Sequence, residues 1–433
     1  MNSRLKNRCV LKGGTGFPES LQGMKEGEIP FIKVSDMTLQ GNEKYITVAN
    51  NYVDEKTAIR LGANIFPVHS TVFAKVGAAL LLNRRRMLIR PTVVDNNMMA
   101  AIPTNIDPDF LYHFLSSIDF ANFVQTGALP SINQSVLGEI EIPDFILSEQ
   151  RTIAEILSAI DQTIEKTEAL IHKYQQIKAG LMHDLFTRGL TADGKLRPPR
   201  EQAPELYKET PIGWIPKEWD YSALRDKAFP GIQHIRTGPF GSALKGEHWV
   251  EDGHPVITIG ALGEGEFIDS ELLYIGDFDV KRLSAFRLKL GEVVFSRVAD
   301  VGRSVVIREN QVGWVMSSNL MRISLDRNQV MPEFLQYQLS GDTRIKVQIR
   351  RKVNSGGREV ANSDILNRLI FAWPQFEEQD SIVKLTNIID EKLQKEKEKK
   401  LKLQKQKVGL MHDLLTGRVR VKVNESNNQN AAA

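Results

Sequence analysis

The side chains of this sequence that could do chemistry are mainly basic, and they gather in two stretches far apart along the chain. Lysine and arginine neutralise phosphate groups, and arginine can also donate two parallel hydrogen bonds to a guanine edge. We therefore predict nucleic-acid contacts in both stretches, with a solvated surface charge as the competing explanation for any single residue. The candidate contacts are Lys75, Arg84, Arg85, Arg86, Arg297, Arg303, Arg350, Arg351, Lys352 and Arg358.

Catalytic motifs are sparse. Asp107 to Phe110 resembles the loop of amino methyltransferases, but its second proline and the glycine-rich turn that should precede it are missing. The glycine-rich stretches 13–16 and 263–265 lack the lysine of a P-loop and the spacing of a dinucleotide fingerprint, so turns explain them better. His183-Asp184 and His412-Asp413 are adjacent pairs, and adjacent side chains on a helix point about 100° apart. They are expected to cap or dock helices, and we predict no catalytic residue.

The composition sets further bounds. The formal net charge of +3 is small for a nucleic-acid-binding chain, so any polyanion site must be local. Cys9 is the single cysteine, which excludes an internal disulfide, and the sequence shows no cluster of cysteine and histidine with metal-ligand spacing. No apolar run approaches 18 residues and the N-terminus lacks a signal-peptide core. These features predict a cytoplasmic protein without a metal site.

The elements that must position the basic residues occur twice. Gly180-Leu181-Met182-His183-Asp184-Leu185, with Thr187, recurs 229 positions later as Gly409-Leu410-Met411-His412-Asp413-Leu414, with Thr416. Each copy closes a segment with apolar residues at alternating steps of three and four, which is the seam of a coiled coil. Thr167 and Lys178 interrupt the first seam. The residues expected to dock partners or helices are Leu181, Met182, His183, Asp184, Leu410, Met411, His412 and Asp413.

A module of short β-type runs precedes each helix, and the two modules align. Residues 70–76 lie over 292–298, and Asn97 lies over Asn319. Each module ends in a proline and an aromatic residue, followed by an acid-glutamine pair that opens the helix, and acidic residues suit a helix N-terminus. The sequence therefore predicts mixed α/β (α+β) modules, two copies of one fold related by a pseudo-twofold axis.

These patterns set the predicted boundaries. In chain order we expect module one at 1–148, helix one at 149–189, a surface linker at 190–210, module two at 211–376, helix two at 377–418 and a disordered tail at 419–433. By the same alignment, the counterpart of Trp214 falls before Met1, so the opening segment of module one is expected to be missing.

Taken together, the residues resemble the specificity subunit of type I restriction-modification systems over essentially the whole chain. The landmarks are the exits into Glu149-Gln150 and Glu378-Gln379, the repeated helix endings, the linker 192–197, and the segments 213–219 and 237–242. The resemblance implies two target-recognition domains joined by two antiparallel helices. Each domain would read one half of a bipartite DNA site, and the chain itself would be non-catalytic.

The resemblance also implies partners. Methylation subunits, two of them by expectation, would dock on the helices and modules, and restriction subunits that translocate DNA would join them. S-adenosylmethionine, ATP and magnesium would be bound by those partners and not by this chain. Two other hypotheses remain at this point: a stand-alone bipartite DNA-binding regulator, and a coiled-coil scaffold that binds no nucleic acid. The DNA target, the spacer length and the base that is modified do not follow from sequence.

Overall fold

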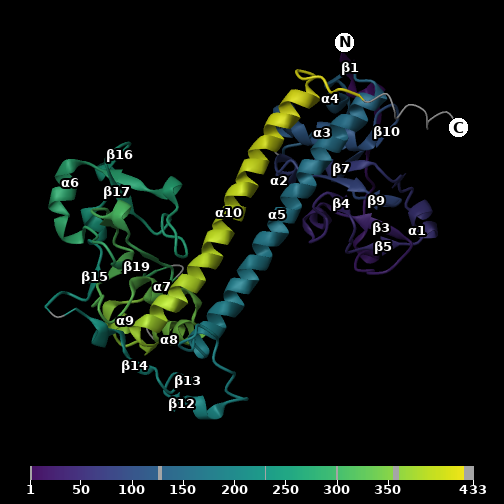
Figure 1. Cartoon of the computed structure of the whole chain (residues 1–433). Coiled ribbons are helices and arrows are strands. Elements are labelled where there is room, and N and C mark those ends of the chain that lie inside the picture. The colour runs from purple at the N-terminus through teal and green to yellow at the C-terminus, as the bar shows by residue number, and fades with distance from the viewer. Residues whose placement is uncertain (1, 125–128, 230, 299–300, 355–359, 424–433) are drawn as a thin grey trace. The chain divides into compact units, whose positions relative to one another are not determined.

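The structure of the protein is a computed structural model, which describes residues 2–124, 129–229, 231–298, 301–354 and 360–423 (Figure 1). The chain divides into two compact units, one of Met1–Ala169 with Lys397–Ala433 and one of Leu170–Glu396. Each unit contains one module and part of both long helices. The tail from 424 onward, for which we expected disorder, and Arg358 lie outside the described residues. None of the described helices is both long and apolar enough to cross a membrane.

The module of the first unit is built on two sheets. The larger has the strand order β2 (Cys9–Gly13), β10 (Met98–Pro103), β7 (Thr71–Ala74), β8 (Arg85–Leu88) and β4 (Tyr45–Ile46). The smaller has the order β5 (Tyr52–Val53), β3 (Ile29–Ile32), β9 (Thr92–Val94) and β6 (Ile65–Phe66). A separate pair joins β1 (Asn2–Arg4) to β11 (Glu141–Pro143). The helices are α1 (Glu55–Arg60), α2 (Ala78–Leu81), α3 (Pro108–Ser117) and α4 (Gln134–Gly138).

The module of the second unit follows the same plan. Its first sheet has the order β15 (Ile235–Thr237), β22 (Leu320–Ile323), β19 (Val293–Ser296) and β20 (Ser304–Val306). Its second has the order β16 (Trp249–Val250), β18 (Leu273–Ile275), β17 (His254–Ile257) and β21 (Val315–Met316). Two further pairs are β14 (Asp220–Ala223) with β23 (Ile370–Trp373) and β12 (Tyr207–Thr210) with β13 (Gly213–Pro216). The helices are α6 (Asp277–Arg282), α7 (Pro332–Gly341), α8 (Thr343–Asn354) and α9 (Ser363–Asn367).

The two modules share their strand pairings, which confirms the prediction of one mixed α/β fold used twice. The antiparallel run β2-β10-β7-β8 corresponds to β15-β22-β19-β20. The parallel pair β3-β9 corresponds to β17-β21, and the first module has a second parallel pair, β4-β8. A glycine follows β2 and β15 at the same place, because a Cβ atom on Gly14 would overlap the carbonyl of Asp95, and one on Gly238 would overlap that of Ser317. The close approach of two backbones explains these glycines better than a phosphate loop does.

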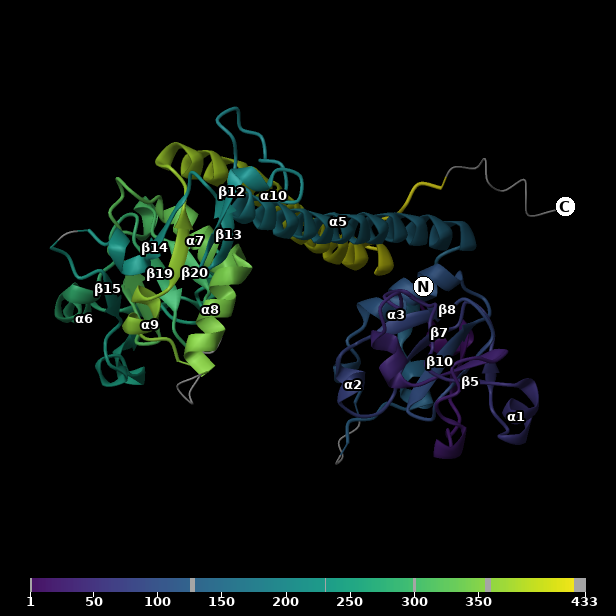
Figure 2. The same cartoon turned by 90° about the horizontal axis from the view of Figure 1, so that it is seen from below.

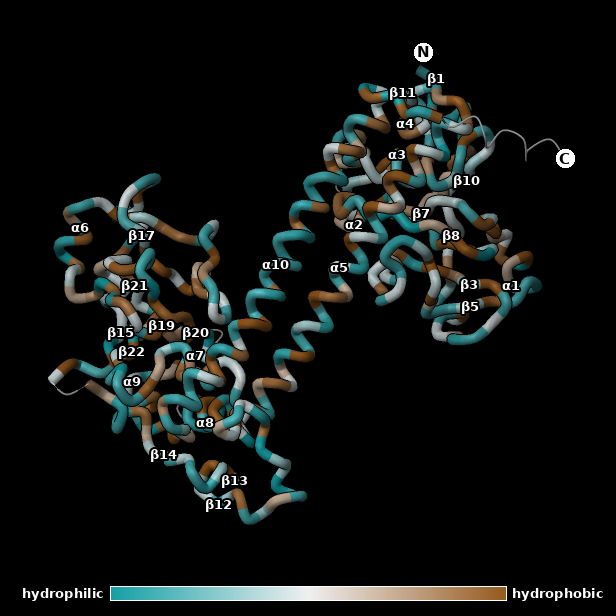
Figure 3. Tube along the Cα trace, viewed as in Figure 1, coloured by the Kyte–Doolittle hydropathy of each residue, from teal (hydrophilic) through white to brown (hydrophobic). Residues whose placement is uncertain are grey.

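Two long helices follow the modules. Helix α5 (Leu147–Thr187) has 41 residues and α10 (Phe376–Leu415) has 40, and they lie side by side in both views (Figures 1 and 2). Each begins one or two residues earlier than the sequence predicts and ends two or three earlier. Apolar residues recur at intervals along both helices between hydrophilic turns, as Figure 3 shows. That spacing is the one expected of helices that bury each other along a narrow stripe.

The polar residues inside the seams form ion pairs between the helices. In the first unit Lys400 Nζ lies 2.8 Å from Glu168, and Lys407 Nζ lies 2.6 Å from Asp161. In the second unit Lys178 Nζ lies 2.6 Å from Asp390. The two pairs of the first unit require the helices to run antiparallel there, since the earlier residue of α5 pairs with the later residue of α10. A shift by one turn would face Lys178 with Thr386 or Gln394 and Asp161 with Leu403 or Met411, so these charges would lose their partners and help to select the alignment of the helices.

Candidate nucleic-acid interface and the joints that position it

Basic residues lie at the ends of two hairpins, β7-β8 in the first module and β19-β20 in the second. Lys75 directly follows β7 and Arg84 directly precedes β8, and these strands pair with Phe73 opposite Arg85. In the second module Arg297 follows β19 and Arg303 precedes β20, with Phe295 opposite Ser304. We call these ends the hairpin tips. Because paired antiparallel strands bring the end of one beside the start of the next, each tip carries two cations.

Neighbouring backbone holds both tips in the same way. The amide of Lys75 donates to the carbonyl of Asn97 at 2.8 Å, and the amide of Arg297 donates to that of Asn319 at 3.1 Å. The carbonyl of Lys75 accepts from Ile132 at 3.0 Å, and that of Arg297 accepts from Ala361 at 2.8 Å. The alignment of Asn97 with Asn319 in the sequence therefore marks an equivalent backbone support. These hydrogen bonds fix the backbone of each tip, while the side chains at the tips differ between the modules. A recognition surface combines a fixed backbone with side chains that can vary in this way.

Arg85 and Arg86, which follow Arg84 in the sequence, donate hydrogen bonds to backbone carbonyls of the first module. Arg85 is 2% exposed, its guanidinium lies 3.6 Å from the centre of the Phe120 ring, and it donates to the carbonyl of Ile118 at 2.8 Å. Burial lowers its pKa to about 10. Arg86 is half-buried and donates to the carbonyl of Met37 at 2.9 Å. These contacts assign Arg85 to the core, and we withdraw it from the candidate nucleic-acid contacts.

A basic amphipathic helix lies beside the tip of the second module. In α8 the residues Ile345, Ile349 and Val353 are buried at steps of four, while Arg350 and Arg351 are exposed and Lys352 is half-buried. Arg303 from the tip and Arg350 from α8 line one small cavity of about 130 Å³, together with Lys346. The structure thus brings separate parts of the second basic stretch to one place. The first module has a short 3₁₀ turn, Phe120–Phe123, after α3 instead of a second helix.

We expect the triple substitution of Arg350, Arg351 and Lys352 by glutamine to weaken DNA binding and to make its salt dependence shallower. Each phosphate contact contributes about 0.9 to the slope of log K against log salt, so the slope should fall by roughly 1 to 3. The measurement is a titration of duplex DNA at several salt concentrations. Substituting Lys392, Lys395 and Lys399 of the solvated face of α10 removes the same charge as a control. An unchanged slope in the α8 variant would remove these residues from the interface.

A buried glutamine joins each long helix to its own module. Gln150 Oε1 accepts from the amide of Asp107, the N-cap of α3, at 2.8 Å. Gln379 Oε1 accepts from the amide of Met331, the N-cap of α7, at 3.0 Å. Each glutamine also donates back to the backbone just before its helix. The second residue of the acid-glutamine pair therefore fixes the angle at which the module meets the helix.

The acidic residue of the pair has different surroundings in the two units. Glu378 accepts from the Arg197 guanidinium at 2.6 Å, from the amide of Leu190 at 2.7 Å and from Trp219 Nε1 at 3.0 Å. Gly189 adopts a φ of 62° beside them, and a Cβ atom there would overlap Glu378, so only glycine fits. Leu190 and Arg197 are buried, so the prediction of a surface linker is wrong for the part of the linker that packs on α10.

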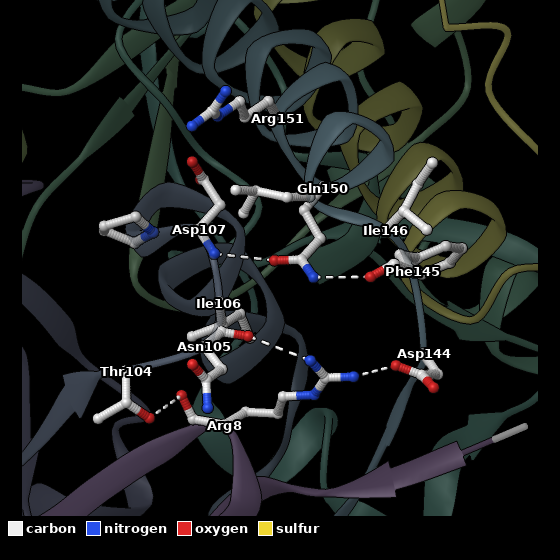
Figure 4. Close-up of a pocket in the computed structure, with 12 residues that line it drawn as sticks. Arg8, Thr104, Asn105, Ile106, Asp107, Asp144, Phe145, Ile146, Gln150 and Arg151 are labelled. Atoms are coloured by element: carbon white, nitrogen blue, oxygen red, sulfur yellow. Dashed lines mark hydrogen bonds and ion pairs between the residues drawn. The ribbon is translucent and has the colours of Figure 1, made fainter. Parts of the chain in front are cut away.

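In the first unit the acidic side chain is equally buried, at 13% exposed, but its cationic partner is exposed. Glu149 pairs with Arg420, whose side chain is 66% exposed, at 2.9 Å. Beside it lies a cavity of about 650 Å³ at the start of α5, which Figure 4 shows with Arg8 paired to Asp144 and donating to the carbonyl of Asn105 at 3.2 Å. Gln150 and Asp107 form its inner wall. The described residues of this unit place no tryptophan where Trp219 lies in the other.

A second joint, which the sequence did not reveal, connects the middle of each module helix to the long helices. His113 of α3 lies 3.1 Å from Ser158 Oγ and 3.9 Å from Asp161, the partner of Lys407. Tyr337 of α7 lies 2.6 Å from Asn387 Oδ1 and 2.8 Å from Asp390, the partner of Lys178. Both are the sixth residue of their helices. We call these two groups the polar junctions, and each ties one module to both long helices.

The first polar junction predicts a dependence of stability on pH. Burial, together with the nearby charges of Lys44 and Lys407, lowers the pKa of His113 to about 4, against an opposite effect of Asp161. His113 is fully buried, so protonation is disfavoured in the folded protein. Its stabilising contribution is complete above pH 6.5, the pKa of the unfolded chain, and is lost as the pH falls towards 4. The loss should reach about 3 kcal/mol.

The variant His113→Gln should lack this loss. All five tryptophans lie in the second unit, so unfolding of the first unit should appear in circular dichroism without a change in tryptophan fluorescence. Urea unfolding at pH 7.5 and pH 5 would measure the difference between wild type and variant. Equal losses of stability in the two proteins would show that His113 is not the titrating group.

The repeated helix endings pack into the module of the other half of the sequence. Met182 and Leu185 belong to the core of the second module, with Leu181 against it, and Met182 covers Gly341 at the end of α7. Leu414 belongs to the core of the first module, with Leu410 and Met411 packed against it. His183 and His412 are exposed, and Asp184 pairs with Arg188 at 3.2 Å while Asp413 is half-buried. The shared threonine bonds back to the histidine carbonyl in both copies.

Comparison with known proteins fits this geometry. The family model of the type I restriction modification DNA specificity domain matches residues 1–176 and 216–405. A curated relative, the type I restriction enzyme MjaVIII specificity subunit of Methanocaldococcus jannaschii, is 22% identical over 338 residues, which are 76% of this chain and 75% of the relative.

Solved structures share the fold. The S subunit of a type I restriction-modification system from M. genitalium has a TM-score of 0.57 at 15% identity, covering 96% of both chains. A chain from a study of complex assembly and conformational transition of the type I system has a TM-score of 0.54 at 14% identity, covering 97% of this chain and 98% of that one. Two matched segments, each a module with its helix, span most of the sequence. This protein therefore belongs to the type I restriction-modification specificity family, whose members are non-catalytic DNA-recognition subunits.

Proposed function

We propose that each module reads one half of a bipartite DNA site and that the two long helices set the unread spacer between the halves. The observation that carries this proposal is the pair of hairpin tips. They have the same backbone support but different side chains, Lys75 and Arg84 in one module and Arg297 and Arg303 in the other. One scaffold that presents two sets of side chains suits the reading of two different sequences.

The partners follow from the family and remain part of the proposal. Methylation subunits would dock on the long helices and modules, two per chain, with the exposed His183 and His412 of the repeated endings at their contact surface. Restriction subunits would join the assembly. S-adenosylmethionine, ATP and magnesium would be bound by these partners. The solved relative studied for complex assembly of the type I system supports an assembly of this kind.

The test is to express the chain with its methylation subunit and to map modified bases across a genome by single-molecule sequencing. We expect one bipartite motif with a fixed unread gap. A stand-alone regulator would instead bind a specific site tightly without any methylation subunit, and a scaffold would show no salt-sensitive DNA affinity. Absence of any motif, with the complex intact and binding S-adenosylmethionine, would overturn the proposal.

A further inference from the structure

The second module contains a basic cavity near the start of β19, at the opposite end of that strand from the hairpin tip. The cavity has a volume of about 410 Å³. It is lined by Arg236, Ser284, Ala285, Arg287, Leu288, Lys289, Val312, Gly313 and Arg322. Four of these residues are cations and none is acidic. Such a lining favours an anion, since the field of several cations inside a concave site adds up.

Two of the arginines face each other across neighbouring strands. Arg236 on β15 is the register partner of Arg322 on β22. Like charges directly opposite each other destabilise an antiparallel pair. The fold does not require this arrangement, because the corresponding pair in the first module is Lys12 and Ala100, with one cation only. An anion bound between the two guanidinium groups would offset the repulsion.

Backbone carbonyls hold all three guanidinium groups in place. Arg236 donates to Ala285 at 3.1 Å, and Arg287 donates through Nε to Gly313 at 3.3 Å. Arg322, only 7% exposed, donates to the carbonyl of Arg287 at 2.8 Å. An arginine has five N–H donors, so one anchored bond leaves others for a ligand. Groups fixed before binding lose little entropy when the ligand arrives.

One buried carboxylate stands behind the cavity. Glu292 lies 3.5 Å from Arg322 Nε and accepts from Ser324 Oγ and from the amide of Lys289, each at 2.8 Å. It neutralises one of the four cations and orients Arg322. A net charge of about +3 therefore remains in and around the cavity, and it attracts an anion.

We infer that this cavity binds a backbone phosphate of the DNA held by the second module, outside the bases that the module reads. The inference rests on the proposed function. The cavity lies near the start of β19 and the hairpin tip lies at its end, four residues away. At ~3.3 Å per residue this separation is about 13 Å, or roughly four base-pair steps of one duplex. A phosphate contact there would fix the position of the DNA without reading its sequence.

The experiment uses the complex with its methylation subunit and a duplex that carries the mapped motif. The variant Arg236→Gln/Arg287→Gln should bind several-fold more weakly, with a salt slope shallower by about 1, since one phosphate contact is lost. Its methylated motif should stay unchanged. The matched control Arg225→Gln/Lys281→Gln loses the same charge outside the cavity and should keep the wild-type slope.

A second variant separates binding from folding. Arg236→Lys/Arg287→Lys keeps both charges but loses the planar fork, so affinity should fall while the slope stays near that of the wild type. If the glutamine variant fails to fold, as judged by tryptophan fluorescence, the DNA affinity of the lysine variant tests the inference instead. Wild-type affinity in the lysine variant, or wild-type affinity and slope in a folded glutamine variant, would overturn the inference.

Inorganic phosphate distinguishes the source of the anion. If phosphate at constant ionic strength raises the melting temperature of the wild type but not of the glutamine variant, while both bind DNA equally, the cavity holds a free oxyanion and the DNA assignment is wrong. If the wild-type complex maps no bipartite motif, the proposed function has failed. A mapped motif with an unchanged variant would overturn only the inference about the cavity.

Discussion

Inserting seven residues into each long helix at facing positions is expected to abolish modification at the natural DNA site and to create a new site with a longer gap. The facing positions are between Ala169 and Leu170 in α5 and between Glu398 and Lys399 in α10, as the pairing of Glu168 with Lys400 indicates. Seven residues add about 10 Å of helix, which corresponds to roughly three base pairs. The two half-sites should remain the same, because neither module changes.

The insertion keeps the seam, since seven residues complete two turns of a coiled coil. Inserting seven residues into α5 alone would separate either Lys178 from Asp390 or Lys407 from Asp161, and should destroy modification altogether. A glycine-serine insertion at the exposed turn of Asp193 and Lys195 adds the same length outside the helices and serves as the control. Mapping of modified bases reads all three variants. If the double insertion changed the half-sites and left the gap fixed, the helices would not set the spacer.

Glu378→Ala is expected to destabilise the second unit by about 3 to 5 kcal/mol, the cost typical of removing one partner from a buried ion pair. Only 7% of the Arg197 side chain and 13% of the Glu378 side chain are exposed. The substitution would leave Arg197 with the exposed Glu218 as its remaining acidic partner and would remove the acceptor of Trp219. Glu378→Gln keeps an acceptor without the charge, so its effect should be smaller.

The equivalent residue of the first unit provides the control. Glu149→Ala breaks a pair whose cation, Arg420, is 66% exposed, so its loss should cost less than that of the pair with the buried Arg197. Urea unfolding followed by tryptophan fluorescence reports on the second unit, and circular dichroism follows both. A loss below 1 kcal/mol for Glu378→Ala would mean that hydrophobic packing of the linker, and not the ion pair, holds the start of α10.

The features predicted from sequence were those encoded by local periodicity or by repetition. The two long helices follow from apolar steps of three and four, and the shared fold follows from aligned segments such as 70–76 and 292–298. The hairpin tips depend on which strands pair, and pairing between distant strands is not visible in a local pattern. In β8 both faces carry apolar residues, Met87 beside Arg85 and Leu88 beside Arg86, so the strand period did not show which arginine would face the core.

Other parts of the site had weaker signals. The linker is polar and rich in proline and glycine, which predicted a solvated segment. That composition gives no sign that Arg197 is buried. Arg236 and Arg322 stand alone in separate strands, so no cluster appears in the sequence. The polar junctions could have been found by extending the module alignment by five residues from Pro108 and Pro332, which places His113 over Tyr337. Because histidine and tyrosine differ chemically, the alignment of the two modules does not mark these two residues as equivalent.

The assembly of the first unit from two distant segments of the sequence also affects when it can fold during synthesis. The first unit is built from two segments far apart in the sequence, Met1–Ala169 and Lys397–Ala433. Its core includes Leu414 and Leu415 from the second of these segments. A ribosome adding about 5 to 20 residues per second needs roughly 10 to 50 seconds to synthesise the intervening residues. During that time the core of the first unit lacks the side chains of Leu414 and Leu415. A chain terminated early can never complete this core, so completion of synthesis is itself a checkpoint for the folding of the first unit.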